Sequence, residues 1–191
     1  MTKVLHLIRH GESEANRAGI YQGQTYDTPL TKMGVRQAKA VAKILPGVKA
    51  DVIYTSPLKR TYETAVEIKK VTDLKLKVED KLLEISHGDW EGKKPEEFDE
   101  KEKLLLKKWR RNPVGVQMPN GENINDVVKR CCYFIDELPE GRYIVVAHDL
   151  VVRVIASMVL SHDFKYLWKY YLDNCGVTTV SFDPYRLVSL N

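Results

Sequence analysis

A run of apolar residues near the start of the chain ends directly at an arginine and a histidine. The segment KVLHLI (3–8) is almost continuously apolar, which is typical of a strand buried on both faces, and Arg9, His10 and Gly11 follow it. Ligands of α/β proteins bind outside the carboxyl ends of parallel strands, so these residues are expected to face a ligand. Gly11 would give the backbone room there. A guanidinium binds oxyanions and a neutral imidazole is a competent nucleophile, so the pair at a strand end is a candidate for chemistry.

A second histidine stands at the end of another apolar run. The segment RYIVVA (142–147) is followed by His148 and Asp149 at a junction between a strand and a helix. Because the carboxyl ends of parallel strands meet at one edge of a sheet, His148 is expected in the same crevice as His10. Taken singly, each histidine could equally be a satisfied residue at the end of a strand.

A further arginine stands near the expected start of a helix. Ser56 and Pro57 are expected to open this helix, with serine as N-cap and proline at the first helical position. Arg60 then lies in the first turn, where the helix dipole disfavours a cation. An anion bound beside Arg60 would offset that cost, although an exposed arginine is the plainer alternative.

Strands and helices alternate along the chain and must position these residues. The expected strands are 3–8, 51–56, 74–79 and 142–147 with a closing pair at 176–183 and 185–191, and the expected helices are 31–45, 56–71, 123–138 and 150–160. This order predicts an α/β three-layer sandwich, a mostly parallel central sheet with helices on both faces. The charged, helical stretch and loop at about 92–120 are expected to form a lid insertion within a single domain, 1–191.

Composition narrows the classes of function. The chain has 191 residues, 43% of them hydrophobic, and its net charge of +4 comes from interleaved charges, so nucleic acid is not an expected partner. It shows no apolar run long enough for a membrane and no signal-peptide core, so a cytoplasmic protein with no membrane partner is expected. Three cysteines without a CxxC pair fit a reducing cytosol. No His, Asp or Cys cluster has convincing ligand spacing, so no metal is expected.

Five segments together carry a family resemblance. They are RHGESEAN (9–16), TPLTKMGVRQA (28–38), SPLKRTYETA (56–65), LLEISHGDWEG (82–92) and AHDLVVR (147–153). In this order and at similar spacing they resemble the signature blocks of the histidine phosphatase superfamily, which includes the cofactor-dependent phosphoglycerate mutases. The resemblance extends from about residue 3 to residue 182.

The resemblance implies a role for each matching residue. His10 would be the nucleophile that becomes a phosphohistidine, and Glu84 would donate a proton to the leaving oxygen. Phosphate-binding roles are implied for Arg9, Arg60, His148, Asn16, Gln22, Gly23 and the backbone of Asp149. Two guanidiniums suit the spread charge of a transferring phosphoryl group better than lysines would. Glu84 must be protonated to act as an acid, so burial or a nearby phosphate should raise its pKa. No metal or cofactor is implied.

Asp149 departs from the family pattern, which usually has glycine after the second histidine. A carboxylate beside a phosphate should repel it. We therefore expect Asp149 to cap the following helix, with its oxygens turned to backbone N–H groups and away from the ligand.

Three functions remain open at this point. ISHGDWEG (85–92) and the loop NPVGVQMPNGEN (112–123) resemble the small phosphatases, so hydrolysis of small phosphomonoesters is favoured. The segment WRR (109–111) instead resembles the paired arginines of phosphoglycerate mutases, and a catalytically inactive phospho-ligand-binding module is the third hypothesis. A cobalamin precursor, a sugar phosphate, phosphoserine or a phosphoglycerate are candidate substrates, and a homodimer is left open.

The remaining conspicuous side chains have plainer interpretations. In the expected lid, Lys93, Lys94, Arg110 and Arg111 either select for extra negative charge on the substrate or form a solvated basic face. His87, Trp90 and Trp109 are expected to have surface or packing roles.

Overall fold

A six-stranded sheet forms the centre of the computed structural model, which describes residues 2–160, 163–169, 171–182 and 186–189. The strand order is β3-β2-β4-β1-β5-β6. The strands are β1 (Lys3–Arg9), β2 (Val52–Thr55), β3 (Lys75–Val78), β4 (Gly141–Ala147), β5 (Val177–Phe182) and β6 (Arg186–Ser189). The first four run parallel, whereas β5 is antiparallel to both β1 and β6. The predicted, mostly parallel sheet is therefore confirmed, with the expected closing pair at one edge.

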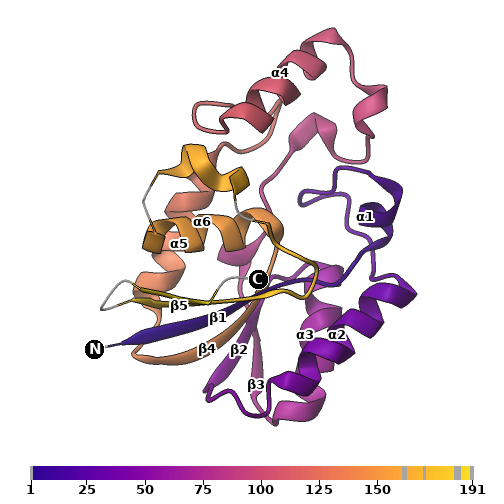
Figure 1. The fold of residues 1–191 in the computed structure, drawn as a ribbon. Helices are drawn as coiled ribbons and strands as arrows, with labels where there is room; N and C mark the ends of the chain where they lie inside the picture. Colours follow the sequence, from indigo (N-terminus) through magenta and orange to yellow (C-terminus); the bar gives the residue numbers. More distant parts are fainter. Residues whose placement is uncertain (1, 161–162, 170, 183–185, 190–191) are drawn as a thin grey trace.

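Helices cover both faces of this sheet (Figure 1). On one face lie α2 (Lys32–Ile44) and α3 (Lys59–Thr72), and on the other lie α5 (Ile124–Glu137) and α6 (Asp149–Leu160). The other helical elements are α1 (Glu14–Ala18), α4 (Glu100–Arg111), η1 (Asp80–Leu82), η2 (Gly88–Trp90), η3 (Pro95–Glu97) and η4 (Phe164–Lys169). The predicted three-layer sandwich is confirmed. Helix α4, from the expected lid, stands apart from the sheet, at the far side of the molecule from α2 and α3.

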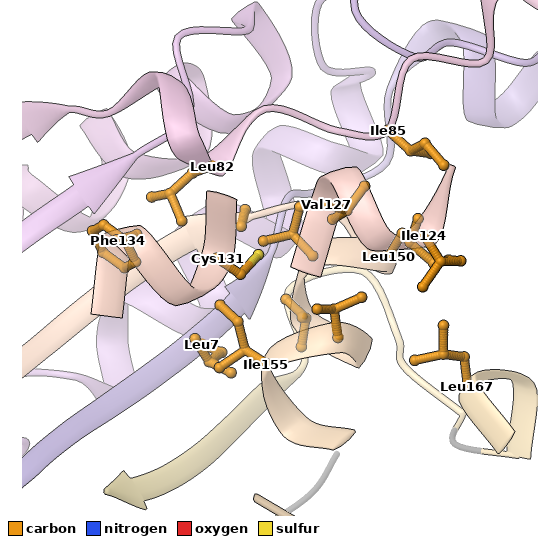
Figure 2. Close-up of a cluster of buried hydrophobic side chains, with 14 of the residues drawn as sticks. Leu7, Leu82, Ile85, Ile124, Val127, Cys131, Phe134, Leu150, Ile155 and Leu167 are labelled. Atoms are coloured by element: carbon orange, nitrogen blue, oxygen red, sulfur yellow. The ribbon is translucent and has the colours of Figure 1, made fainter. Parts of the chain in front are cut away.

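Alternate residues of the central strands supply two separate cores. Leu7 and Val145 join the larger cluster beneath α5 and α6, whereas Ile8 and Val146 join the cluster beneath α2 and α3. Figure 2 shows Leu7 directed into the same cluster as Cys131 of α5. Because both faces are buried, β1 and β4 are almost continuously apolar, which explains the runs in the sequence. Among the described residues, no helix combines the length and the hydropathy that crossing a bilayer would require.

Two backbones approach closely where β1 ends. A Cβ added to Gly11 would lie 2.5 Å from the Gly34 carbonyl oxygen, and one on Gly34 would lie 2.1 Å from the Glu12 carbonyl oxygen. Gly34 belongs to the first turn of α2, where its N–H donates to the predicted N-cap, Thr31, at 2.9 Å. The space left by the absent side chain of Gly11 is therefore occupied by the backbone of α2 and is not left for a ligand.

The predicted start of α3 was wrong. The helix begins at Lys59, and Leu58 occupies the N-cap position without a side-chain hydrogen bond. The carboxylate of Asp27, from a distant loop, accepts the Lys59 N–H at 2.9 Å instead. The hydroxyl of Ser56, expected to be the cap, lies 2.9 Å from Nε2 of His148. A serine before proline is typical of a helix cap, but here its hydroxyl is hydrogen-bonded to His148, which directly follows β4.

We predict that Gly34→Ala destabilises the protein by about 1 kcal/mol. Alanine should gain about 1 kcal/mol in helix propensity, but overpacking against backbone costs about 1–3 kcal/mol. The clashing Glu12 carbonyl belongs to the backbone, which cannot move aside as a flexible side chain could. Urea denaturation measures the difference. Gly47→Ala is the matched control, because nothing lies within 4 Å of its added Cβ. Equal stability of the two variants would contradict the close approach.

Candidate active site

A cavity of about 780 Å³ gathers residues from distant parts of the chain. Of the predicted site residues, Arg9, His10, Asn16, Gln22, Gly23, Arg60, Glu84, Arg110 and Asp149 line it. His148 lies behind this wall, fully buried, with its ring centroid 5.3 Å from that of His10. Arg111 is absent from the lining. The sequence therefore identified most of one site, which lies where β1 and β4 end.

His10 is held as a neutral imidazole with one free nitrogen. Burial and the nearby charges of Arg60 and Arg9 hold its pKa well below the ordinary value, although its hydrogen bond to Gly11 acts in the opposite direction. Nδ1 lies 2.7 Å from the Gly11 carbonyl oxygen. A carbonyl only accepts, so Nδ1 carries the proton and Nε2 keeps its lone pair. That tautomer is the one a nucleophile requires.

His148 has the complementary arrangement. Its Nε2 is bonded to the Ser56 hydroxyl, and its buried Nδ1 has no hydrogen-bond partner within the described residues. Burial, Arg60 and His10 hold its pKa well below the ordinary value, so this ring is also neutral. If the Ser56 hydroxyl donates to Nε2, the proton of His148 resides on Nδ1. A buried N–H without a partner is costly unless an acceptor is supplied.

Arg60 carries a charge that is almost completely buried. Its side chain is 1% exposed, and burial lowers its pKa while Glu84 and Asp27 act to raise it. Nη1 donates to the Asp27 carboxylate at 3.3 Å, and Nη2 donates to the Gly23 carbonyl oxygen at 2.9 Å. Its Nε has no partner among the described residues. The site therefore contains a desolvated cation, and a bound oxyanion would complete its hydrogen bonds and balance its charge.

The expected capping role of Asp149 was wrong. Its carboxylate accepts from Nε and Nη2 of Arg153 at 2.7 and 3.2 Å and lies 3.4 Å from Nη1 of Arg9. The two guanidiniums offer the carboxylate stronger, charge-assisted partners than backbone N–H groups would. Asp149 therefore remains in the cavity wall as part of an ion-pair network.

Glu84 is placed to act as an acid near neutral pH. Burial, with a smaller contribution from the charge of Asp149, raises its pKa to about 7, although the N–H of Ile85 and the charges of Arg60 and Arg130 act in the opposite direction. Oε1 accepts the Ile85 N–H at 3.0 Å. The expectation that burial raises the pKa of this carboxyl therefore agrees with its surroundings.

Two side-chain amides on the cavity wall have their oxygens occupied. Oδ1 of Asn16 accepts the Ser13 N–H at 3.1 Å within a capping box that opens α1. Oε1 of Gln22 accepts from the hydroxyls of Ser13 and Thr28 at 3.0 and 3.2 Å. The occupied oxygens leave the NH₂ groups of Asn16 and Gln22 as the donors available to an anion.

Sequence reasoning missed Glu91, which joins two loops of the site. Its Oε2 accepts the N–H groups of Gln24 and Thr25 at 3.1 and 2.6 Å, and Oε1 accepts the His87 N–H at 2.9 Å. Burial acts to raise the pKa of Glu91, but hydrogen bonds from Thr25, Gln24 and His87 outweigh it and lower the pKa. Glu91 stood inside a recognised motif, yet nothing in the sequence separates it from a surface carboxylate.

Glu122 was missed as well, and it fixes the segment that carries Glu84. Its Oε2 accepts the Ser86 N–H at 2.8 Å and Nε2 of Gln24 at 3.1 Å, while Oε1 pairs with Arg130 at 3.2 Å. Gln24 also donates to the Glu84 carbonyl oxygen at 2.8 Å. The position of the acid is therefore set by a bonded network.

His87 and Trp109 line the cavity. The His87 ring packs edge-on against Tyr21 and Trp109, with centroids 5.0 and 6.4 Å away, and burial lowers its pKa to about 4. Of the two roles expected for His87, surface or packing, the structure therefore shows packing. Trp90 packs beside Tyr21 and is fully buried, as expected.

The four lid cations divide into two groups. Lys94 and Arg110 line the cavity. Lys93 instead pairs with Glu102 at 2.9 Å, and Arg111 contributes no surface to the cavity. Of the four cations expected to contact substrate or to form a solvated face, one lysine and one arginine therefore line the cavity. Among the described residues, no group of three or more His, Cys, Asp or Glu is arranged to hold a metal ion.

Comparisons with known proteins agree with this geometry. The model of the histidine phosphatase superfamily (branch 1) matches residues 5–191. Phosphoserine phosphatase 1 of Hydrogenobacter thermophilus is 36% identical over 194 residues, covering 100% of this chain and 91% of that protein. A solved mutant of the phosphoserine phosphatase of Entamoeba histolytica, in complex with phosphoserine, has a TM-score of 0.84 and 31% identity, with 99% and 96% of the two chains covered. Bacillus stearothermophilus YhfR has a TM-score of 0.89 and 26% identity, with 99% and 96% covered.

We predict that Glu91→Gln lowers stability by about 2 kcal/mol, the size of one or two charge-assisted hydrogen bonds. It should also weaken binding of inorganic phosphate, because the loop whose Gly23 carbonyl holds Arg60 loses its anchor. Urea denaturation and calorimetric titration with phosphate measure the two effects. Glu140→Gln is the control, since Glu140 is exposed and distant from the cavity lining. Unchanged stability and phosphate affinity in Glu91→Gln would contradict the anchoring role.

Proposed function

The chain belongs to the histidine phosphatase superfamily, as its motifs predicted, and on that premise we propose that it is a metal-independent phosphatase of small phosphomonoesters. Hydrolysis would pass through a phosphohistidine on His10. The observation that carries the proposal is the neutral His10, with Nδ1 occupied by the Gly11 carbonyl and Nε2 free, beside the buried charge of Arg60. Phosphoserine is the first substrate to consider, because the names of two relatives contain phosphoserine phosphatase.

In the first step, Nε2 of His10 attacks phosphorus and the bond from phosphorus to the ester oxygen breaks. Glu84 gives its proton to the departing oxygen, which leaves as an alcohol. Arg9, Arg60, Nδ1–H of His148 and the amide groups of Asn16 and Gln22 are the donors proposed for the three equatorial oxygens. They support catalysis by charge stabilisation, the main requirement of phosphoryl transfer. The phosphorylated imidazole is cationic, and its Nδ1–H continues to donate to the Gly11 carbonyl.

In the second step, the ionised Glu84 removes a proton from water and the water oxygen attacks phosphorus. The bond from Nε2 to phosphorus breaks, and inorganic phosphate leaves. His10 is again neutral and Glu84 again protonated, so both groups return to the states favoured by burial. General acid–base catalysis of this kind contributes about 10²–10⁴ in rate.

A phosphatase is favoured over a mutase by the lid. A mutase must hold the carboxylate of its product while excluding water, and the resemblance assigned that task to paired arginines. Of Arg110 and Arg111, only Arg110 lines the cavity. The lining pairs one arginine with Lys94, so a carboxylate meets one planar guanidinium and one ammonium instead of two guanidiniums, which supports departure of the product.

Release of phosphate in the presence of EDTA tests the proposal. The substrates are p-nitrophenyl phosphate, phosphoserine, 3-phosphoglycerate and a sugar phosphate, and both product and free phosphate are measured. Chelator-resistant release of phosphate is expected, with the highest kcat/KM for phosphoserine. Conversion of 3- to 2-phosphoglycerate without free phosphate would instead identify a mutase. Phosphate binding with neither activity would identify an inactive binding module.

We predict that His10→Ala abolishes acid-labile labelling by ³²P-phosphorylated substrate, because the imidazole whose Nδ1 is fixed by the Gly11 carbonyl is removed. Rapid quenching in alkali, followed by gel autoradiography, measures the phosphohistidine. His6→Ala is the control, since His6 lies in β1, the strand that ends just before His10, and its Nδ1 lies 3.0 Å from the Thr179 hydroxyl, outside the cavity lining. Persistent labelling of His10→Ala would remove His10 from the role.

We predict that kcat/KM falls as pH rises through about 7, the pKa of Glu84, because the acid must enter the reaction protonated. His10 does not limit the acidic side until well below pH 6.5, since its pKa is lowered. Glu84→Gln should remove this alkaline limb and lower kcat/KM for phosphoserine by about 10²–10⁴. The loss of kcat/KM for p-nitrophenyl phosphate should be much smaller, because kcat/KM reports the phosphorylation step and nitrophenolate leaves without a proton. Equal losses of kcat/KM with both esters would exclude Glu84 as the acid.

A further inference from the structure

Asp149 is a carboxylate in the wall of a cavity that is proposed to hold phosphate. Its negative charge opposes an anionic ligand, and capping of α6 does not account for it. Its partners are two guanidiniums, Arg153 at 2.7 and 3.2 Å and Arg9 at 3.4 Å. Asp149 therefore joins a residue of the site to one behind it.

Arg153 extends this network to the lid. Its Nη1 donates to the Leu167 carbonyl oxygen at 2.8 Å, and its guanidinium lies over the Trp168 ring, 5.5 Å from the centroid. Nε1 of Trp168 in turn donates to the Trp109 carbonyl oxygen in α4 at 2.8 Å. The side chain of Arg153 is only 10% exposed, so the carboxylate of Asp149 is held against a buried, multiply bonded partner.

On its other side, Asp149 lies beside Arg9. Nη1 of Arg9 donates to the Leu172 carbonyl oxygen at 2.7 Å and lies 3.4 Å from Oδ1 of Asp149. Nε of Arg9 is buried and has no partner among the described residues. Nε and Nη2 form the edge through which a guanidinium binds two oxygens of one oxyanion. Within the part of the chain that the structure describes, no protein hydrogen bond occupies that edge.

We propose that Asp149 is a positioning residue for the hydrolysis proposed above: anchored by Arg153, its carboxylate fixes Arg9 with the Nε–Nη2 edge toward the phosphoryl oxygens. The inference rests on that proposed function. It also explains why a carboxylate is compatible with the site, since its charge is matched by two guanidiniums before any ligand arrives.

A second consequence of the same placement concerns Glu84. The charged groups that act on this carboxyl are Asp149 from α6, Arg60 from α3 and Arg130 from α5. Asp149 is the one that favours the protonated form, and both arginines oppose it. Removing the negative charge of Asp149 should therefore move the ionisation of Glu84 to lower pH, in addition to releasing Arg9.

Asp149→Asn tests the proposal, because it keeps the size of the side chain and removes its charge. We expect kcat for phosphoserine to fall about tenfold, since a misplaced Arg9 costs transition-state stabilisation. The inhibition constant of inorganic phosphate should not rise, because the cavity becomes more positive. The alkaline limb of kcat/KM should move to lower pH. A merely structural defect would lower the active fraction without moving the limb.

Two further variants separate the effects. Asp149→Glu keeps the charge but lengthens the side chain, so the alkaline limb should stay in place while kcat falls. Glu100→Gln changes the net charge equally on an exposed part of α4 and should alter neither quantity. Wild-type kcat and pH profile in Asp149→Asn would overturn the proposal.

A measurement without turnover distinguishes failure of this inference from failure of the proposed function. The carboxyl carbon of Glu84 is followed by ¹³C NMR titration in the wild type and in Asp149→Asn, with the signal assigned from Glu84→Gln. Titration at lower pH in Asp149→Asn is expected even if the wild type hydrolyses none of the substrates. An unmoved titration would overturn the coupling of Asp149 to Glu84, whatever the activity of the wild type.

Discussion

The buried charge of Arg60 is the constraint on which the rest of the site depends. A guanidinium that is 1% exposed has lost nearly all its hydration, and Asp27 and the Gly23 carbonyl replace only part of it. Its field helps to hold His10 and His148 neutral. Neutrality gives His10 the lone pair of a nucleophile, so one buried cation both attracts the anion and prepares the group that attacks it.

Carboxylates help to hold the loops in place around this charge. Loops beyond the carboxyl ends of strands present backbone N–H groups that need acceptors. Glu91 satisfies such groups in two loops at once, and Glu122 satisfies another beside Glu84 while pairing with Arg130. Because these bonds are made before a ligand binds, the donors and the acid need little rearrangement during the reaction.

The sequence predicted what local patterns encode and missed what depends on contacts between distant loops. Continuous apolar runs located β1 and β4, because strands buried on both faces have no polar side to interrupt them. Their ends located His10 and His148. Ser56 was mistaken for a helix cap because its interaction with His148 comes from strand pairing that no local pattern shows. The partners of Asp149 were missed for a related reason, since Arg9 lies far away in sequence.

Two carboxyl groups share this cavity, and their surroundings divide the work between them. Asp149 has two guanidinium partners, so its negative charge is compensated and serves to hold other groups. Glu84 has one backbone N–H and little solvent, so burial favours its neutral form. An arriving phosphate adds negative charge and favours the proton on Glu84 further. In the proposed mechanism the leaving group takes that proton, and burial makes the resulting carboxylate a stronger base than an ordinary glutamate, able to accept a proton from water. The proposed alternation of acid and base is therefore supported by burial and by the fixed charge of Asp149.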